Sequence, residues 1–394
     1  MARAGRSVLL LEQSEAFADR VRGEWIAPWG VTEVKRLSLY DVLAQAGGHH
    51  VSRHVTYDET RSPQEAEASA LPLDIFAPDV PGPLCLGHPR HCQALFEAAK
   101  AAGAEARRGV QVTGVTLGPA PAVAFTEGDR ASEARARLVV GADGRTSNVR
   151  ETAGIRLHQD RPHHWFAGLL VEGAEGWDPE LQAIGTEGDL GFLVFPQGGG
   201  RVRLYGGYAL DQARRFRGPD GARRFLDALG MPCSPRNRAL VAARPAGPLL
   251  SYINADSWTD APYGEGVVLV GDAAGWNDPI IGLGLSITYR DVRMVSDILA
   301  AGDDWSPAAF RPYGEERAER LRRLRFAAAI QSRLDMEFDE AARARRRRHF
   351  ERSAADPAVG LHGIAVMAGP EAVPADFFTD AGWAHALGPE ETPP

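Results

Sequence analysis

The sequence predicts an α/β fold with an inserted antiparallel sheet and a helical C-terminal region. Short apolar strands alternate with helices over the first part of the chain, a strand-rich segment follows over residues 155–250, and a helical pattern covers most of the chain after Trp305. A chain of 394 residues exceeds the size at which a single core stops growing, so we expect two packed lobes.

The first part of the chain alternates between predicted helices and strands, which is typical of an α/β sheet. We expect the end of a helix at ARAG with Gly5 as its cap, a buried strand in SVLLLEQ, helices over residues 40–46 and 90–102, and strands over residues 111–117 and 137–140.

The middle of the chain predicts an antiparallel sheet. The stretches HWFAGLLVEG, GDLGFLVFP and RVRLYGGYAL have the composition of strands. The QGGG between the last two predicts a hairpin turn rather than a phosphate loop, because it joins two strands and opens no helix. A buried strand follows over residues 266–270, and a long helix begins after Gly284.

The C-terminal part is expected to be mostly helical, since RAERLRRLRFAAAI carries apolar residues at helical spacing. The basic run ARARRRRHF, residues 342–350, is interpreted as a solvated helix face rather than an anion site. The last 25 residues are rich in Pro, Gly and Ala, and we expect them to be loosely held.

Composition excludes several classes of protein. No apolar run approaches the roughly 18 residues of a membrane helix. The apolar run within the first twelve residues is too short for the core of a signal peptide. The net charge of −8 argues against nucleic acid as a main partner. Three cysteines without a CxxC pair fit a reducing compartment. We therefore expect a cytoplasmic protein without stable membrane insertion, and the sequence leaves its oligomeric state open.

Glu12 is the first candidate binding residue. It stands at the end of the apolar strand VLLL, where an acid in a dinucleotide-binding fold accepts hydrogen bonds from ribose hydroxyls. A charged residue also marks the place where any strand reaches solvent, and this plainer interpretation stays open.

A turn with the sequence GADGRTSNVR, residues 141–150, is the second candidate. The glycines on either side of Asp143 allow a tight turn and a close approach of the backbone to a ligand, and Ser147 can cap the helix that follows. A plain capped turn is the alternative.

A second turn, GDAAGWNDPIIGLGL over residues 271–285, follows the strand VVLV. Asp272 stands where the strand ends and can accept a hydrogen bond from a sugar or ribityl hydroxyl. Past Pro279, the amides of residues 282–284 begin a helix, whose positive dipole end favours an anion. A reduced flavin carries negative charge along one edge and is a suitable ligand.

The two turns together resemble a known family. A DG motif followed at about this separation by a GD motif is similar to the FAD-dependent monooxygenases of the aromatic-ring hydroxylase (p-hydroxybenzoate hydroxylase-like) family. The resemblance extends from residue 1 to about residue 335. It implies a Rossmann-like FAD-binding domain with an inserted antiparallel-sheet substrate domain and a helical C-terminus.

The resemblance also implies domain boundaries. The FAD-binding domain would comprise residues 1–60, 84–154 and 251–304, the substrate domain residues 61–83 and 155–250, and the helical region residues 305–394.

The same resemblance implies the cofactor-binding residues. These are Glu12 at the ADP ribose, Arg22 at the pyrophosphate or ring, Arg90 at the ribityl or phosphate region, Asp143 in a motif linked with FAD and NAD(P)H, Gly271 and Asp272 at the ribityl chain, and Pro279, Gly282, Leu283 and Gly284 around the isoalloxazine.

The implied activity is monooxygenation of a small organic molecule. NAD(P)H acts as a transient reductant of the flavin, O2 adds to form a C4a-hydroperoxide, and one oxygen is transferred to an aromatic or polyketide-like ring or an alkene. Candidate walls of the substrate pocket are the aromatic residues of the antiparallel sheet, half of which must face away by strand alternation: Phe192, Phe195, Tyr205 and Tyr208. No catalytic acid or base can be named.

Three departures from the family pattern stand out. Gly275 replaces the histidine of the usual GDAAH, and Ser286 replaces the asparagine of the usual GxGxN. The first strand and the GxGxxG turn are absent before ARAGRSVLLLE, so we expect an N-terminally truncated chain. Because that turn supplies a helix N-terminus for the pyrophosphate, we also expect poor FAD affinity.

Two alternative functions stay open: a flavin-dependent reductase or dehydrogenase of the geranylgeranyl-reductase type, and a truncated non-catalytic relative. A halogenase is disfavoured because LVFPQ lacks that group's tryptophan motif, and no GxSxG elbow supports a hydrolase. Cys85, His88, His91 and Cys92 lie as close together as zinc ligands, but their segment also begins a helix at Arg90, so we expect no metal site.

Overall fold

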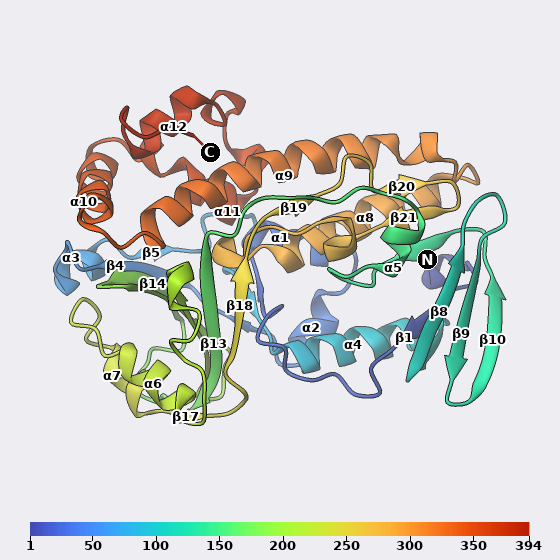
Figure 1. Ribbon diagram of the computed structural model, residues 1–394, viewed down its shortest axis with the longest axis horizontal. Helices are drawn as coiled ribbons and strands as arrows, with labels where there is room; N and C mark the ends of the chain where they lie inside the picture. The colour runs from blue at the N-terminus through green and yellow to red at the C-terminus, as the bar shows by residue number, and fades with distance from the viewer. Residues whose placement is uncertain (394) are drawn as a thin grey trace.

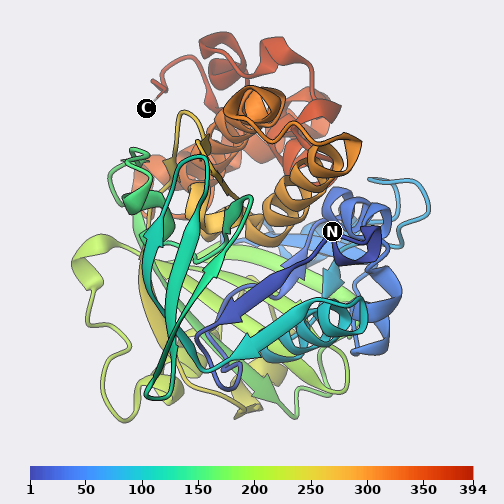
Figure 2. The ribbon, with the colours of Figure 1, turned by 90° about the vertical axis from the view of Figure 1, so that its right-hand side faces the viewer.

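The computed structural model describes residues 1–393 and confirms a mixed α/β fold with a helical C-terminus. In Figure 1 the helix α9 (Pro307–Asp335) extends above α8 (Gly284–Ala301), and a large sheet with α6 and α7 beneath it occupies the lower left. Figure 2 shows the C-terminal helices on one side of the molecule and the sheets on the other. None of the helices in residues 1–393 combines the length and the apolar composition that crossing a membrane requires.

The α/β part contains short strands, two pairs of which are parallel. Strand β1 (Leu9–Glu12) pairs with β7 (Glu105–Arg108), and β11 (Val139–Gly141) pairs with β21 (Val267–Leu269). The other short strands here are β2 (Trp25–Ile26), β3 (His49–His50), β6 (Leu84–Cys85), β12 (His158–Gln159), β19 (Ser257–Trp258) and β20 (Tyr263–Gly264). The helices are α1 (Pro28–Arg36), α2 (Tyr40–Gln45), α4 (His88–Ala101) and α5 (Asn148–Thr152), together with α8.

Several predicted elements are confirmed within two residues, namely the helices at 40–46 and 90–102 and the strand at 137–140. Gly5 caps a short 3-10 helix, as expected, in a left-handed conformation. The strand expected in SVLLLEQ is present as β1, but the expectation that it is buried was wrong, since Leu9 is 37% exposed. Among the described residues only β7 pairs with this strand, so much of its surface stays uncovered.

The strand predicted at 111–117 belongs to a separate antiparallel sheet. This sheet consists of β8 (Val110–Thr116), β9 (Ala122–Glu127) and β10 (Arg130–Arg135). The hairpin of β9 and β10 was not predicted, because its alternating polar residues lack the apolar run of a buried strand.

A large mixed sheet forms the second layer, in the order β17-β13-β16-β15-β14-β4-β5 with β18 also on β13. Its strands are β4 (Arg53–Asp58), β5 (Leu71–Pro72), β13 (His164–Glu172), β14 (Leu181–Glu187), β15 (Leu190–Pro196), β16 (Arg201–Tyr208), β17 (Arg244–Pro245) and β18 (Leu250–Asn254). The predicted antiparallel pairing is confirmed for β13, β15 and β16, whereas β14 pairs with β4 in parallel. The QGGG hairpin is confirmed, and all three glycines have positive φ.

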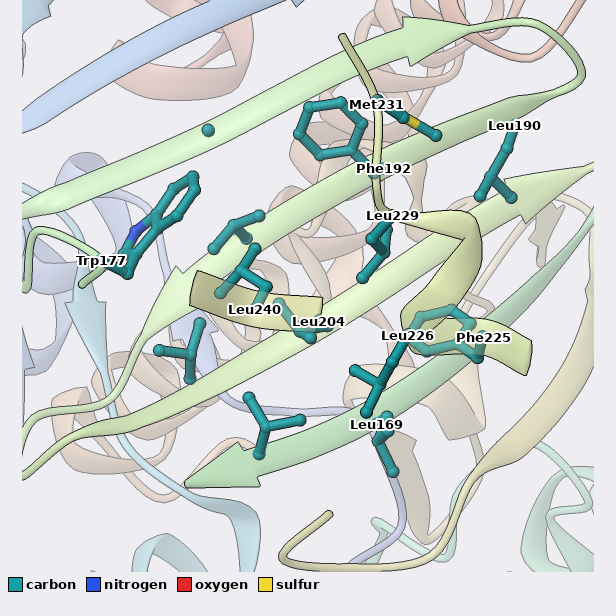
Figure 3. Close-up of a cluster of buried hydrophobic side chains, with 14 of the residues drawn as sticks. Leu169, Trp177, Leu190, Phe192, Leu204, Phe225, Leu226, Leu229, Met231 and Leu240 are labelled. Carbon is teal, nitrogen blue, oxygen red and sulfur yellow. The ribbon is translucent and has the colours of Figure 1, made fainter. Parts of the chain in front are cut away.

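One face of this sheet packs against the short helices α6 (Gly221–Ala228) and α7 (Asn237–Ala242). Figure 3 shows Leu169, Phe192 and Leu204 of the sheet pointing toward Phe225 and Leu240 of these helices. Another helix, α3 (Pro63–Ala68), packs beside β4 and begins with a capping box formed by Ser62. The opposite face of the sheet is therefore free to line a cavity.

The C-terminal region contains α9, α10 (Glu340–Ala355), α11 (Leu361–Ala368) and α12 (Asp380–Leu387). The expectation that the last residues are loosely held was wrong. Trp383 is 1% exposed and packs with Phe377, Phe378 and Leu334. This apolar cluster fixes α12 against α9.

The solvated face predicted for ARARRRRHF was also wrong, although the helix is present as α10. Arg345 and Arg346 are almost completely buried. Arg346 forms an ion pair with Asp58 at 2.6 Å, and Arg345 pairs with Glu391 at 2.8 Å. Acids from β4 and from the end of the chain neutralise these arginines, and sequence spacing could not show that.

We expect Trp383→Ala to lower the free energy of unfolding by about 3 to 5 kcal/mol, because it leaves a large cavity in the C-terminal cluster. Urea unfolding followed by circular dichroism measures this change. Ile75→Ala is the control, since Ile75 is 62% exposed and should matter by less than about 0.5 kcal/mol. Equal effects of the two substitutions would show that the last helix is not packed as described.

Candidate functional site

A cavity of about 620 Å³ lies between the turns of the α/β part, the free face of the large sheet and the C-terminal helices. This volume is within the range of about 300 to 1,000 Å³ that is usual for small-molecule sites. Its lining comes from three sources, which are described in turn.

The first wall is the turn after β21 together with the start of α8. Gly271, Asp272 and Pro279 line the cavity, as do Gly282, Leu283 and Gly284. No side chain caps the N-terminus of α8, so its first amides are open to the cavity. Gly282 has a φ of 66°, which residues other than glycine rarely adopt. A Cβ atom on Gly284 would meet no described atom within 4 Å, so there is open space in front of this residue. The predicted helix start therefore lies at the cavity, but the Gly282 amide donates to the Pro279 carbonyl at 2.9 Å, which leaves the amides of Leu283 and Gly284 for a ligand.

A buried ion pair holds this wall in place. Asp291 of α8 accepts from Arg317 of α9 at 2.9 Å, and its carboxylate also accepts from the Gly271 amide at 2.9 Å. Arg317 donates in addition to the carbonyls of Ala274 and Gly275, at 2.8 and 2.9 Å. Burial alone would raise the pKa of Asp291, but Arg317 and its neighbour Arg320 hold it below its usual value. The sequence did not predict this pair, because Arg290 and Arg293 lie beside Asp291 and nothing local marks its carboxylate as buried.

The turn 141–150 lies beside the first wall, because β11 and β21 are parallel neighbours. Arg150 donates to the Ala273 carbonyl at 3.0 Å and to the Arg145 carbonyl at 3.1 Å, which ties the two turns together. Gly144 and Arg145 line the cavity, and Arg145 Nε lies 3.3 Å from Asp272 Oδ2.

Three arginines gather at this end of the cavity, where Arg20, Arg22 and Arg145 contribute to its lining beside His88. Burial lowers the pKa of Arg22, and the nearby charge of Arg145 lowers it further. Between the two loop arginines Val21 has φ 55°, an uncommon conformation for a β-branched residue. This strained loop directs two guanidinium groups to one region, which suits an anionic ligand.

Three of the predicted cofactor residues do not line the cavity. Asp143 accepts from Ser147 Oγ at 2.5 Å and from the Val149 amide at 3.1 Å, so it shapes its own turn, and Ser147 caps α5 as expected. Glu12 accepts from the Ser14 amide at 2.6 Å at the end of β1. Arg90 is exposed and lies beside Gly47. His88, at the start of the same helix, lines the cavity instead. The sequence did not predict this residue as part of the cofactor site.

The two substitutions in the GD motif have structural reasons. Gly275 has φ 109°, and a Cβ there would lie 2.6 Å from backbone atoms of Ser257 and Trp258, so histidine does not fit this backbone. Ser286 Oγ accepts from the Ala27 amide at 3.1 Å and thereby attaches the start of α8 to the segment before α1.

The second wall is the free face of the large sheet. Phe195 and Tyr205 line the cavity, together with Ile184 and Leu193. The other two predicted aromatic residues, Phe192 and Tyr208, lie on the opposite face, in the cluster with α6, because successive side chains of a strand alternate. Figure 3 shows Phe192 on this opposite face of the sheet, beside Met231.

The phenol of Tyr205 is held by a buried charged group. It donates to Glu24 at 3.2 Å, and Glu24 pairs with Arg203 at 2.5 Å. Burial acts against the charge of Arg203, but Glu24 and Asp19 keep its pKa above the usual value. The cluster anchors the strained loop around Val21 to the sheet.

The third wall comes from the C-terminal helices, which contribute Leu334, Asp335, Phe350 and Met367 among others. Burial raises the pKa of Asp335 to about 6. Arg346 also lines this end, but its charge is already neutralised by Asp58 and Glu59. This end of the cavity therefore combines apolar side chains with one carboxyl group and with the buried rings of His349 and His362.

Comparison with known proteins identifies the family. Residues 1–328 match the family model described as FAD binding domain. The chain belongs to this family. The predicted resemblance and the predicted cofactor, FAD, are thereby confirmed at the level of the family.

Curated relatives include several oxidoreductases. The chain is 31% identical over 198 residues to ubiquinone hydroxylase UbiL of Rhodospirillum rubrum, and the aligned region covers 45% of this chain and 42% of that protein. It is 27% identical over 226 residues to digeranylgeranylglycerophospholipid reductase 1 of Methanopyrus kandleri, covering 56% and 57%. The chain thus spans about half the length of the curated relatives that it matches.

Solved structures of the same fold include p-nitrophenol 4-monooxygenase PnpA from Pseudomonas putida. Its TM-score is 0.73 at 18% identity, over 99% of this chain and 94% of that chain. HpxO from Klebsiella pneumoniae, complexed with FAD, gives a TM-score of 0.72 at 18% identity, with 94% of each chain covered. At this identity the likeness shows the fold.

The residues of the first wall fit FAD. The uncapped start of α8 offers the amides of Leu283 and Gly284, Gly284 leaves space that no described side chain fills, and the arginines at the same end of the cavity supply positive charge for phosphates. Asp272 supplies an acceptor for a hydroxyl group.

Asp291→Asn should lower the free energy of unfolding by about 3 to 5 kcal/mol, because it leaves two buried arginines without their carboxylate. Asp297→Asn is the matched control on the same helix, since Asp297 is 66% exposed and its pair with Arg293 should contribute about 1 kcal/mol or less. Urea unfolding compares the two variants. If both lose the same small amount, the buried pair does not hold this wall.

Proposed function

We propose that the protein is an FAD-dependent monooxygenase that hydroxylates or epoxidises a small organic substrate, aromatic or polyketide-like, with NAD(P)H and O2. One observation carries the proposal. A wall suited to a flavin and a wall of aromatic and aliphatic side chains face each other across one cavity. Such an arrangement brings a redox cofactor and an apolar substrate into contact.

Bound FAD supplies the redox and oxygen chemistry; the chain's own residues bind, orient and enclose. In this proposal the amides of Leu283 and Gly284 stabilise negative charge at the edge of the flavin ring, because the Gly282 amide already donates to the Pro279 carbonyl. Asp272 accepts a hydrogen bond from the ribityl chain, and Arg22 and Arg145 attract the phosphates. Glu12 stays the proposed ligand of the adenosine ribose.

The sheet wall excludes water and orients the substrate. Phe195 and Tyr205 contact each other edge to face, with ring centroids 6.1 Å apart. Tyr205 is fixed through Glu24, so this aromatic surface is rigid. A rigid wall of apolar side chains would keep water away from the site of reaction.

A flavin-dependent reductase is the second candidate, and the match to the Methanopyrus kandleri reductase supports it. In that case the same cavity would hold an alkene, and its product would be hydrogenated rather than oxygenated.

Isotope labelling distinguishes the two candidates. The protein is incubated with FAD, NADH or NADPH, 18O2 and a panel of phenols, polycyclic aromatic ketones and terpenoid alkenes. A monooxygenase incorporates one 18O atom per product and depends on O2. Formation of a hydrogenated product under anaerobic conditions would instead establish the reductase. The proposal would be overturned if none of the substrates caused oxidation of NADH or NADPH.

Arg22→Gln should weaken FAD binding about tenfold or more, because it removes a charge-assisted hydrogen bond to an anionic ligand. Arg90→Gln is the matched control and should change the affinity by less than about twofold, since Arg90 lies away from the cavity. Quenching of flavin fluorescence on titration measures both. A larger loss of FAD affinity in Arg90→Gln would show that Arg90 belongs to the cofactor site.

A further inference from the structure

A chain of four polar side chains crosses the floor of the cavity. Trp25 Nε1 lies 2.9 Å from Gln182 Oε1, Gln182 Nε2 lies 3.2 Å from His54 Nδ1, and His54 Nε2 lies 3.1 Å from Thr56 Oγ1. All four line the cavity. His54 and Thr56 are on the same face of β4, and Gln182 is the partner of His54 on β14.

The chain of hydrogen bonds has one direction. The indole nitrogen of Trp25 can only donate, so the oxygen of the Gln182 amide must face it and the amide nitrogen must face His54. That nitrogen donates to Nδ1, which leaves the proton of a neutral imidazole on Nε2. Burial lowers the pKa of His54 to about 4, in agreement with a neutral ring. His54 Nε2 therefore donates to Thr56.

Thr56 ends the chain with a hydroxyl hydrogen that is free for another acceptor. Within residues 1–393 no protein group accepts a hydrogen bond from Thr56 Oγ1. The nearby phenols are engaged, because Tyr205 donates to Glu24 and Tyr252 donates to the Val21 carbonyl at 3.3 Å. Thr56 thus presents a directed donor on the substrate side of the cavity.

The surroundings of Thr56 limit the ligand further. Ile184, the partner of Thr56 on β14, and Leu334 are apolar parts of the lining. Arg346 is already paired with two carboxylates, and Asp335 places a carboxyl group in the same end of the cavity. The two histidines that line this end are buried, which lowers their pKa values and favours neutral rings. Among the described residues of this end, a carboxylate ligand would therefore find no free cation, and it would face a second acid.

We infer that Thr56 binds an uncharged acceptor oxygen of the substrate, a ketone or quinone carbonyl on an otherwise apolar ring system. Trp25, Gln182 and His54 are positioning residues that fix the direction of the Thr56 hydroxyl. The inference rests on the proposed function, because it takes this cavity as the substrate site. It adds the substrate class that the family assignment leaves open.

Three probes of nearly equal shape test the inference: 1-acetylnaphthalene, 1-isopropenylnaphthalene and 1-naphthoate. Binding to the oxidised, FAD-supplemented full chain at pH 7.5 without reductant is measured by calorimetry. We expect the ketone to bind about five to ten times more tightly than the hydrocarbon, as one hydrogen bond provides, and more tightly than the carboxylate. Equal affinity for ketone and hydrocarbon, or tighter binding of the carboxylate, would overturn the inference.

Substitutions locate the effect. Thr56→Val keeps the shape of the side chain and should abolish the preference for the ketone, whereas Thr56→Ser should keep it. Thr126→Val on β9, outside the cavity lining, is the matched control and should behave like the original protein. A ketone preference that survives in Thr56→Val contradicts the inference.

Infrared spectroscopy gives a second readout that needs no variant. The carbonyl band of bound 1-acetylnaphthalene should shift to lower frequency, because a donated hydrogen bond weakens the C=O bond; an unshifted band contradicts the inference. Neither measurement requires turnover. A protein that prefers the ketone but never incorporates oxygen would contradict the proposed function alone, and one that incorporates oxygen without the preference would contradict this inference alone.

Discussion

The buried carboxylate of Asp291 is the constraint on which the site depends. Taking a charge out of water is costly, and it is tolerated here because two arginines of α9 and the Gly271 amide share the carboxylate. The same arginine that pairs with it also binds the carbonyls of the turn after β21. Helix α8, helix α9 and the turn are therefore fixed as one unit. The open start of α8 faces the cavity because that unit is rigid.

The large sheet gives the cavity its other wall through strand alternation. Side chains of one parity, such as Phe192 and Leu204, pack on α6 and α7 (Figure 3), and those of the other parity, such as Tyr205, face the cavity. The buried pairs of α10 with β4 and with the end of the chain close the far end. Cofactor wall, substrate wall and closing helices thus come from segments far apart in sequence.

Sequence could predict the parts of the site that local geometry determines. Glycines with positive φ, the cap at Ser147 and the uncapped helix start after Gly282 are all local, and the paired turns around them led to the correct family. It could not choose between Arg90 and His88, because the direction of a side chain at a helix start depends on packing. Nor could it find the burial of Arg346, whose partners lie almost 290 residues earlier, at Asp58 and Glu59. Strand parity was predicted, but the face that meets the cavity was not.

A crystal structure of the full chain soaked with FAD and 1-acetylnaphthalene would show whether one cavity holds cofactor and substrate together. We expect density for the isoalloxazine at the amides of Leu283 and Gly284, and density for the ketone between the flavin and the sheet, with its oxygen at Thr56. Density for the isoalloxazine outside this cavity, or for the ketone on the face of the sheet that packs against α6, would contradict it.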